Sequence, residues 1–450
     1  MINANANPEK RFFIDLIVRD ISLVDAILDL IDNAIDSLVR TKDIDLYKDF
    51  KSTDDSSDTS LAKIDIKYSK DQFSIEDNCG GITFESARDE VFRFGHPDPH
   101  NRFSLSVFGI GMKRAIFKIG GQINIESHAL DSGFRMDMKV AEWLEDTKPE
   151  WTIPIHRVGG EADETKTGTK IKITDLRDEI RTLTETPVTE NRLIRMIQDT
   201  YPFHLGKHIR IFVNGKEVEV VDLTFGKSDY IEPAEESWDD NSVNARLICG
   251  LLPHDDDKWS WERSGWYIVC NGRVIVNADK SPLTGWEELL PLFMPKHRGF
   301  LGIVFFVSDE PENLPWNTTK RGINTESAVF IRAQKRMITA SRLVLKHQNK
   351  LYESSVSGEP KVNLKEITGE LKAISATTLA ATSVTLASPD GRKSLEWKPP
   401  IKQQVYSSVQ FSVKAEEMES AKSRIGRKSM SNKAVGEYVF KYYLDRECSE

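Results

Sequence analysis

The amino-acid sequence predicts a mixed α/β protein of the α+β type, in which an α/β sandwich is followed by a second α/β unit. Three observations support this fold class. An amphipathic helical pattern covers residues 22–38, runs of alternating apolar and polar residues begin near residue 61, and a later group of strand-like runs ends in a long helical pattern at 327–352. Strands covered by one helical layer are typical of a sandwich. The later strand-like runs, which we assign to the second unit, are 208–220, 264–278 and 298–310.

The length and composition predict several domains in a soluble, cytoplasmic protein. Because 450 residues exceed the size of one domain, we expect an N-terminal domain at 1–182, a second at 183–352 and a partly flexible, helical tail at 353–450. The net charge of −9 argues against a uniformly basic nucleic-acid binder. The polar N-terminal stretch and the lack of an apolar run of about 18 residues predict neither a signal peptide nor a membrane span. The cysteines share no CxxC spacing, which fits a reducing compartment: Cys79, Cys249, Cys270 and Cys448.

The first helix carries the most informative residues. Ser22 and Asp25 have the spacing of a capping box, so the helix is expected to begin there. Asp29 and Asn33 are four residues apart and therefore share one helical face. A carboxylate there can orient a water molecule, and a carboxamide can supply a neutral oxygen ligand to a hard cation. The opposite stripe is apolar and faces the core: Leu23, Ile27, Leu30 and Ala34.

A strand hairpin is predicted at 61–78, and it ends at Asp77 before two glycines. Bare backbone at Gly80 and Gly81 lets a flat ligand approach, and the Asp77 carboxylate would accept a hydrogen bond from an exocyclic amine. Taken alone, the same residues favour an ordinary hairpin turn.

Two further segments have weaker signals. Gly109 and Gly111 enter a helix whose first turn carries Lys113, an arrangement suited to phosphates but also to a packing turn. The spacing is not that of a Walker motif, and the polar segment 94–107 before it has the length of a mobile lid. Thr169 begins a strand and, by itself, needs no function.

Together the four segments resemble the GHKL ATPase superfamily, which includes the gyrase B subunit, MutL, MORC proteins, histidine kinases and large heat-shock chaperones. The matching motifs are DLIDNAID at 29–36, DNCGG at 77–81, FGIGMK at 108–113 and TGT at 167–169. The resemblance covers residues 10–180. It implies a Bergerat fold, with ATP lying over an antiparallel sheet and magnesium bridging its phosphates.

The resemblance also implies roles for individual residues. Asn33 would bind Mg²⁺, Asp77 would accept from the adenine amino group, and Asp29 would activate the attacking water. Gly81, Gly109 and Gly111 would admit the nucleotide and hinge the lid. Thr169 would support Asp77, and Lys113 would stabilise phosphate charge.

Two positions depart from the family pattern. Many relatives carry Glu where this chain has Asp29, and the missing methylene moves the carboxylate back by about one C–C bond. The first glycine of the adenine motif is replaced by Cys79. Both changes leave the binding chemistry in place and put the hydrolysis rate in question.

The middle region resembles the transducer domain of the gyrase, MutL and MORC branch, which has a ribosomal-protein-like fold. That domain sends one lysine to the γ-phosphate, and in LPWNTTKRGI we assign this role to Lys320, with Arg321 as the neighbouring alternative. A solvated basic loop is an equally good interpretation of this segment.

The leading hypothesis is a Mg²⁺-dependent ATPase in which ATP binding drives homodimerisation and hydrolysis reverses it. A histidine kinase is disfavoured, because no phosphoacceptor histidine precedes residue 22. The open alternative is a nucleotide-gated interaction module that hydrolyses little ATP. Such a module would act either like a chaperone or as a DNA clamp. DNA, protein partners, stress response and defence against phage are all compatible with the resemblance.

Overall fold

The structure is a computed structural model. It describes residues 9–49, 61–95, 102–146, 151–227, 233–253, 259–356, 372–375, 392–393, 412–427 and 429–447. These residues form two compact units, the first of which runs to Tyr352 and includes the short strands after it, whereas the second holds the C-terminal helices. In the described part of the chain, every helix is too short or too polar to cross a membrane.

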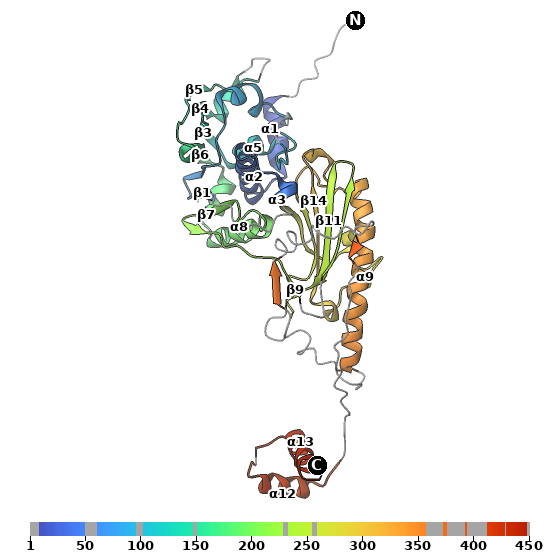
Figure 1. The fold of residues 1–450 in the computed structure, drawn as a ribbon. Coiled ribbons are helices and arrows are strands. Elements are labelled where there is room, and N and C mark those ends of the chain that lie inside the picture. The colour runs from blue at the N-terminus through green and yellow to red at the C-terminus, as the bar shows by residue number, and fades with distance from the viewer. Residues whose placement is uncertain are drawn as a thin grey trace. The chain divides into compact units, whose positions relative to one another are not determined.

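The first unit begins with a mixed sheet of eight strands under a layer of helices, as the α/β sandwich prediction requires. Helix α5 (Gly111–Ile119) packs against α1 (Lys10–Arg19) and α2 (Leu23–Thr41), and α2 and α5 also contact the sheet (Figure 1). In spatial order the strands are β5 (His156–Gly159), β4 (Ser132–Lys139), β3 (Gly120–His128), β6 (Gly168–Leu176), β2 (Gln72–Asp77), β1 (Ala62–Tyr68), β7 (Ile209–Val213) and β8 (Lys216–Glu217). The helices of this region are α1 (Lys10–Arg19), α2 (Leu23–Thr41), α3 (Leu46–Asp49), α4 (Phe84–Ser86), α5 (Gly111–Ile119), α6 (Val140–Glu145), α7 (Asp178–Thr184) and α8 (Pro187–Thr200).

One strand lies in a different sheet from the one that the sequence predicts. The run at 208–220 was assigned to the second α/β unit, but β7 pairs in parallel with β1, with Ile64 opposite Ile211. Both of these side chains are buried, so β7 completes the hydrophobic face that β1 leaves open at its edge. The first sheet therefore continues past residue 182.

The second sheet has α9 (Ala328–Val356) alongside its strands (Figure 1). Ala333 and Met337 of the helix are fully buried, and Trp266 Nε1 donates to Ser341 Oγ at 3.1 Å. The strands are β13 (Arg273–Asp279), β12 (Gly265–Cys270), β14 (Phe300–Val307), β11 (Val243–Leu251), β10 (Ala234–Asp240) and β16 (Arg392–Lys393), in that spatial order. A separate pair joins β15 (Lys372–Ser375) to β9 (Thr224–Lys227).

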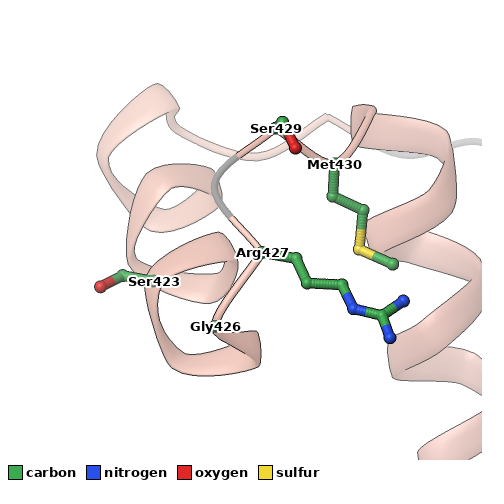
Figure 2. Close-up of a pocket in the computed structure, with 5 residues that line it drawn as sticks. All are labelled: Ser423, Gly426, Arg427, Ser429 and Met430. Atoms are coloured by element: carbon green, nitrogen blue, oxygen red, sulfur yellow. The ribbon is translucent and has the colours of Figure 1, made fainter.

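The second unit contains α12 (Ala415–Ile425) and α13 (Asn432–Glu447). The turn between them borders a pocket of about 630 Å³ lined by Ser423, Gly426, Arg427, Ser429 and Met430. Arg427 and Met430 extend in the same direction from this turn, whereas Ser423 points away (Figure 2). All the lining residues except Met430 are exposed, so the pocket has no buried polar group that would select a ligand.

Candidate functional site

Helix α2 is the platform of the site, and it begins where the capping box predicts. Ser22 Oγ accepts from the Asp25 backbone N–H at 3.2 Å, and Asp25 Oδ2 accepts from the Ser22 N–H at 3.3 Å. The face that carries the carboxylates is also covered, because Asp29 is only 2% exposed and Asp32 is 0% exposed. Burying carboxylates is costly unless they are paired, so the partners of these groups define the site.

Asn33 has a fixed orientation. Its Nδ2 donates to the Asp29 carbonyl one turn earlier at 2.6 Å, and its Oδ1 accepts from Ser106 Oγ at 3.0 Å. Asn33 lies on the wall of a cavity of about 130 Å³ that Gly109, Gly111 and Lys113 also line. The structure therefore brings together four of the predicted site residues around one cavity.

Asp36 holds the segment before the glycines, a role that the sequence does not reveal. Its carboxylate accepts from Ser104 Oγ at 2.9 Å and from the backbone N–H groups of Leu105 and Ser106 at 2.6 and 2.9 Å. Burial raises the pKa of Asp36, against these hydrogen bonds, which lower it. Residues 104–106 belong to the predicted lid at 94–107. Residues 96–101 of that lid lie outside the part of the chain that the structure describes.

Lys113 lies in the first turn of α5, as predicted, and its side chain is turned toward the wall of the cavity. Its Nζ donates to the Val91 carbonyl at 2.7 Å and lies 5.8 Å from the centroid of the Phe94 ring. Burial lowers the pKa of Lys113 to about 8. Among the described residues one carbonyl accepts from this ammonium, and a phosphate that entered the cavity would be a stronger acceptor.

Two of the three predicted glycines, Gly81 and Gly109, are in positions where a side chain does not fit or where the backbone needs glycine. Gly81 has φ +70°, and a Cβ there would lie 2.0 Å from the His128 carbonyl oxygen. Gly109 has φ +60°, a left-handed conformation that glycine adopts readily. At Gly111 a Cβ would lie 3.5 Å from the Asp29 side chain, so this glycine packs directly against the predicted water-activating residue.

Asp77 ends β2, next to the two glycines. Desolvation of its carboxyl raises the pKa of Asp77 to about 6, although hydrogen bonds from the backbone amides of Cys79 and Thr169 oppose this shift. The Cys79 N–H donates to Asp77 Oδ1 at 2.9 Å. Cys79 is buried and, unlike Gly80 and Gly81, does not have a positive φ, so a side chain fits at this departure from the family pattern.

The hydroxyl of Thr169 reaches Ser127 rather than Asp77. The two hydroxyl oxygens lie 2.8 Å apart, and Ser127 Oγ also accepts from the Ile82 N–H at 2.8 Å. Ser127 is fully buried and ties β3 to β6 and to the glycine turn, and no sequence motif identifies it. Ser37 Oγ of α2 donates to the Gly81 carbonyl at 3.2 Å, which connects this side of the site to the cavity.

Asp29 is engaged in a buried fork with Arg114, the residue after Lys113. Arg114 Nε donates to Asp29 Oδ2 at 2.5 Å, and Nη2 donates to Oδ1 at 2.9 Å. Lys320 Nζ lies 3.5 Å from the same Oδ1. Burial opposes ionisation of Asp29, but Lys320 and Arg114 outweigh it and lower the pKa of this carboxyl.

Lys320 lies between β14 and α9, in what we call the second α/β region (the second sheet and α9), and its side chain reaches α2. It is therefore not part of a solvated loop. It is only 4% exposed and its ammonium forms an ion pair with Asp32 Oδ2, which also pairs with Arg273. Tyr201 donates to Asp32 Oδ1 at 2.7 Å. The alternative residue, Arg321, pairs instead with Asp25 at the start of α2.

The arrangement has the chemistry of a metal–nucleotide site. The cavity presents the amide oxygen of Asn33, the hydroxyl of Ser106 and, beneath them, the Asp36 carboxylate, which are oxygen donors of the kind that Mg²⁺ binds. Its 130 Å³ is below the roughly 300 Å³ at which ligand pockets begin, so the cavity would have to widen to admit a nucleotide.

A comparison with protein families finds a match that spans this region of the chain. The model of the family described as histidine kinase-, DNA gyrase B- and HSP90-like ATPase matches residues 21–165. A search of curated proteins finds no matching relative. The matched range contains α2, the Asp77 turn and α5, so the similarity to GHKL-type ATPases covers the elements that build this site.

Proposed function

We propose that the chain binds Mg²⁺-ATP in the α2 cavity and hydrolyses it to ADP and phosphate, with hydrolysis controlled by the release of Asp29. The observation that carries this proposal is the convergence of Asn33, Gly109, Gly111 and Lys113 on one cavity beside Asp29 and Lys320. The family match of residues 21–165 supports a nucleotide as the ligand.

Each part of the site has a separate task in this proposal. Asp77 accepts from the adenine amino group, and the glycine turn at Gly81 lets the base lie against bare backbone. Asn33 holds Mg²⁺, which neutralises phosphate charge when it is bound. Lys113 leaves the Val91 carbonyl for the phosphates, and Asp29 orients the attacking water once Arg114 has released it.

Homodimerisation through the N-terminal helix is the second part of the proposal. Phe12 and Leu16 are 63% and 51% exposed and lie four residues apart on one face of α1. The opposite face is anchored by Ile14, Val18 and Lys10, whose Nζ donates to the Asp146 carbonyl at 2.9 Å. A rigid helix with an exposed apolar face is suited to pairing with a second copy.

A second candidate function is a nucleotide-gated interaction module with little hydrolysis. The fork between Asp29 and Arg114 favours it, because a carboxylate whose two oxygens are both occupied and whose pKa is lowered is a poor base. In this case ATP binding alone would drive dimerisation, and phosphate release would not accompany it.

One set of measurements on the full chain separates these functions. We expect Asn33→Ala to abolish Mg²⁺-dependent ATP binding in calorimetry and Asp29→Asn to bind ATP but to lose single-turnover hydrolysis. Asp71→Asn, in an exposed turn, is the matched control and should behave as the unaltered chain. Dimerisation by light scattering with ATP, without phosphate release, would identify the interaction module, and unchanged hydrolysis in Asp29→Asn would exclude the assigned role of Asp29.

The client of the switch is tested by DNA titration with and without a non-hydrolysable ATP analogue. Salt-sensitive binding confined to the ATP state would indicate a DNA clamp, because phosphate contacts release counterions. Binding in neither state would direct the search to protein partners.

A further inference from the structure

The contacts of Asp32 join three segments that are far apart in the sequence. Tyr201 follows α8, Arg273 begins β13, and Lys320 lies in the loop after β14. All three side chains converge on the carboxylate of Asp32 in the middle of α2, and all are buried. Asp32 therefore fixes the second α/β region to the helix that carries Asn33.

Lys320 is held there in an unusual backbone conformation. Its φ is +54°, in the left-handed region that residues other than glycine rarely adopt. The loop is closed by Asn317, whose carbonyl accepts from the Lys320 N–H at 2.9 Å and whose N–H donates to the Gly322 carbonyl at 2.9 Å. A strained backbone that places a charged group in a site is a recurrent feature of functional loops.

The cluster contains more cations than carboxylates. Among the described residues it holds Arg114, Arg273 and Lys320 against Asp29 and Asp32, and the neighbouring Asp36 is engaged by segment 104–106. Lys320 is the member that contacts both carboxylates, at 3.5 Å from Asp29 Oδ1 and in an ion pair with Asp32. Arg273 pairs with Asp32 and would still neutralise it if Lys320 moved away.

We propose that Asp32 is a competing acceptor that holds Lys320 until the γ-phosphate of ATP takes it, while Arg273 and Tyr201 remain on Asp32 as the fixed contact between the two α/β regions. This inference rests on the proposed function and assigns its regulation to Asp32. The γ-phosphate carries more charge than one carboxylate and offers three acceptor oxygens, so it can win this competition. When Lys320 leaves, Asp29 also loses one of its two cations.

Competition makes a prediction that a merely structural ion pair does not. Asp32→Asn removes the competing charge but keeps an acceptor for Tyr201, so the full chain should bind a non-hydrolysable ATP analogue about tenfold more tightly, while its affinity for ADP stays within twofold. In a Lys320→Met background the same substitution should have no such selective effect. Asp240→Asn is the matched control, because Asp240 is a buried carboxylate paired with Arg332 in the second sheet.

Calorimetry with ADP and with the analogue gives distinguishable outcomes. Weaker binding, or an equal change for both nucleotides, in Asp32→Asn overturns the competition. If the unaltered chain binds neither nucleotide, the proposed function fails and this inference fails with it. If it binds both but Asp32→Asn lacks the selective gain, only this inference fails.

Hydrogen exchange on the unaltered chain covers the case in which Asp32→Asn does not fold. The analogue, but not ADP, should change exchange in the loop around Lys320, whereas peptides that contain Arg273 should respond alike to both nucleotides. Equal exchange in the Lys320 loop with both nucleotides would show that Lys320 is a fixed structural cation.

Discussion

The two sides of the site are built in different ways. Around Asp77 the contacts are hydrogen bonds among Cys79, Thr169 and Ser127, which lie on adjacent strands and turns of one sheet. Around Asp32 the contacts are ion pairs with side chains more than two hundred residues away. The side around Asp77, which we propose as the base side, is therefore a local structure of one sheet, whereas the ion-pair cluster around Asp32, on the proposed phosphate side, joins two distant regions of the chain.

The largest expected effect concerns the stability of the phosphate side. Asp32→Asn leaves Arg273 and Lys320 buried with one fewer carboxylate, which should lower the free energy of unfolding by about 3–5 kcal/mol. Urea denaturation measures this loss. Asp240→Asn should cost about 1 kcal/mol or less, because its partner Arg332 is half exposed. Equal losses of stability in Asp32→Asn and Asp240→Asn would show that the Asp32 cluster contributes no more to stability than an ordinary ion pair.

The next effect tests the base side. Asp77→Asn replaces a charged acceptor with a neutral one, and a hydrogen bond to a charged group contributes about 1.5–3 kcal/mol, so ATP affinity should fall about 10- to 100-fold. Calorimetry with ATP gives this value. Glu76→Gln, one residue earlier and exposed, should bind as the unaltered chain does, and the urea midpoint of Asp77→Asn at neutral pH should not fall, because the substitution removes a desolvated charge.

The pH dependence of binding follows from the same carboxyl. Because the pKa of Asp77 is about 6 in the folded chain, lowering the pH from 7.5 to 5 should protonate most of it and weaken ATP binding about tenfold. The contribution of Asp77 to stability has the opposite sign: a pKa raised above its ordinary 3.8 means that stability rises as the pH falls from about 6 toward 4. Asp77→Asn should show neither trend, and an unchanged pH profile in that variant would assign the titration to another group.

The smallest effect concerns Ser127. Ser127→Ala removes the hydroxyl that joins the Ile82 N–H, Thr169 and the glycine turn, and should cost about 1–2 kcal/mol of stability and a few-fold of ATP affinity. Ser74→Ala is the control, since its hydroxyl makes only a 3.4 Å contact with the Lys67 carbonyl on the same sheet. If Ser127→Ala lost more stability than Asp32→Asn, the Asp77 side rather than the Asp32 side would contribute more to stability.

Local signals in the sequence were sufficient for much of the fold. The capping box at Ser22 and Asp25 predicted the start of α2, and the strand predicted at Thr169 is β6 (Gly168–Leu176). The strands β10 and β11 were not predicted, and for β10 the reason is its polar sequence, AEESWDD, which lacks an apolar stripe. The partner of β7 was also missed, since periodicity identifies a strand but not the strand beside it.

The same limit applies to the site. Asn33, Gly109, Gly111 and Lys113 belong to motifs, and the structure places them around one cavity. Arg273 and Tyr201 have no motif, because each is a single residue whose partner is set by packing between distant segments. Arg114 directly follows the glycine motif, but the motif does not identify Asp29 as its partner. The run of carboxylates in α2 was the available signal: buried carboxylates require cations, and the sequence does not say which ones.

The position of β7 has a practical consequence for anyone who expresses the ATPase region separately. A fragment that stopped at residue 182 would lack β7 and would leave the N–H and C=O groups of β1 unpaired beside buried Ile64 and Ile66, an edge that invites self-association. It would also lack Tyr201, one of the donors to Asp32. A fragment that ended after Glu217 would keep all eight strands, and it is the shorter one that we expect to aggregate.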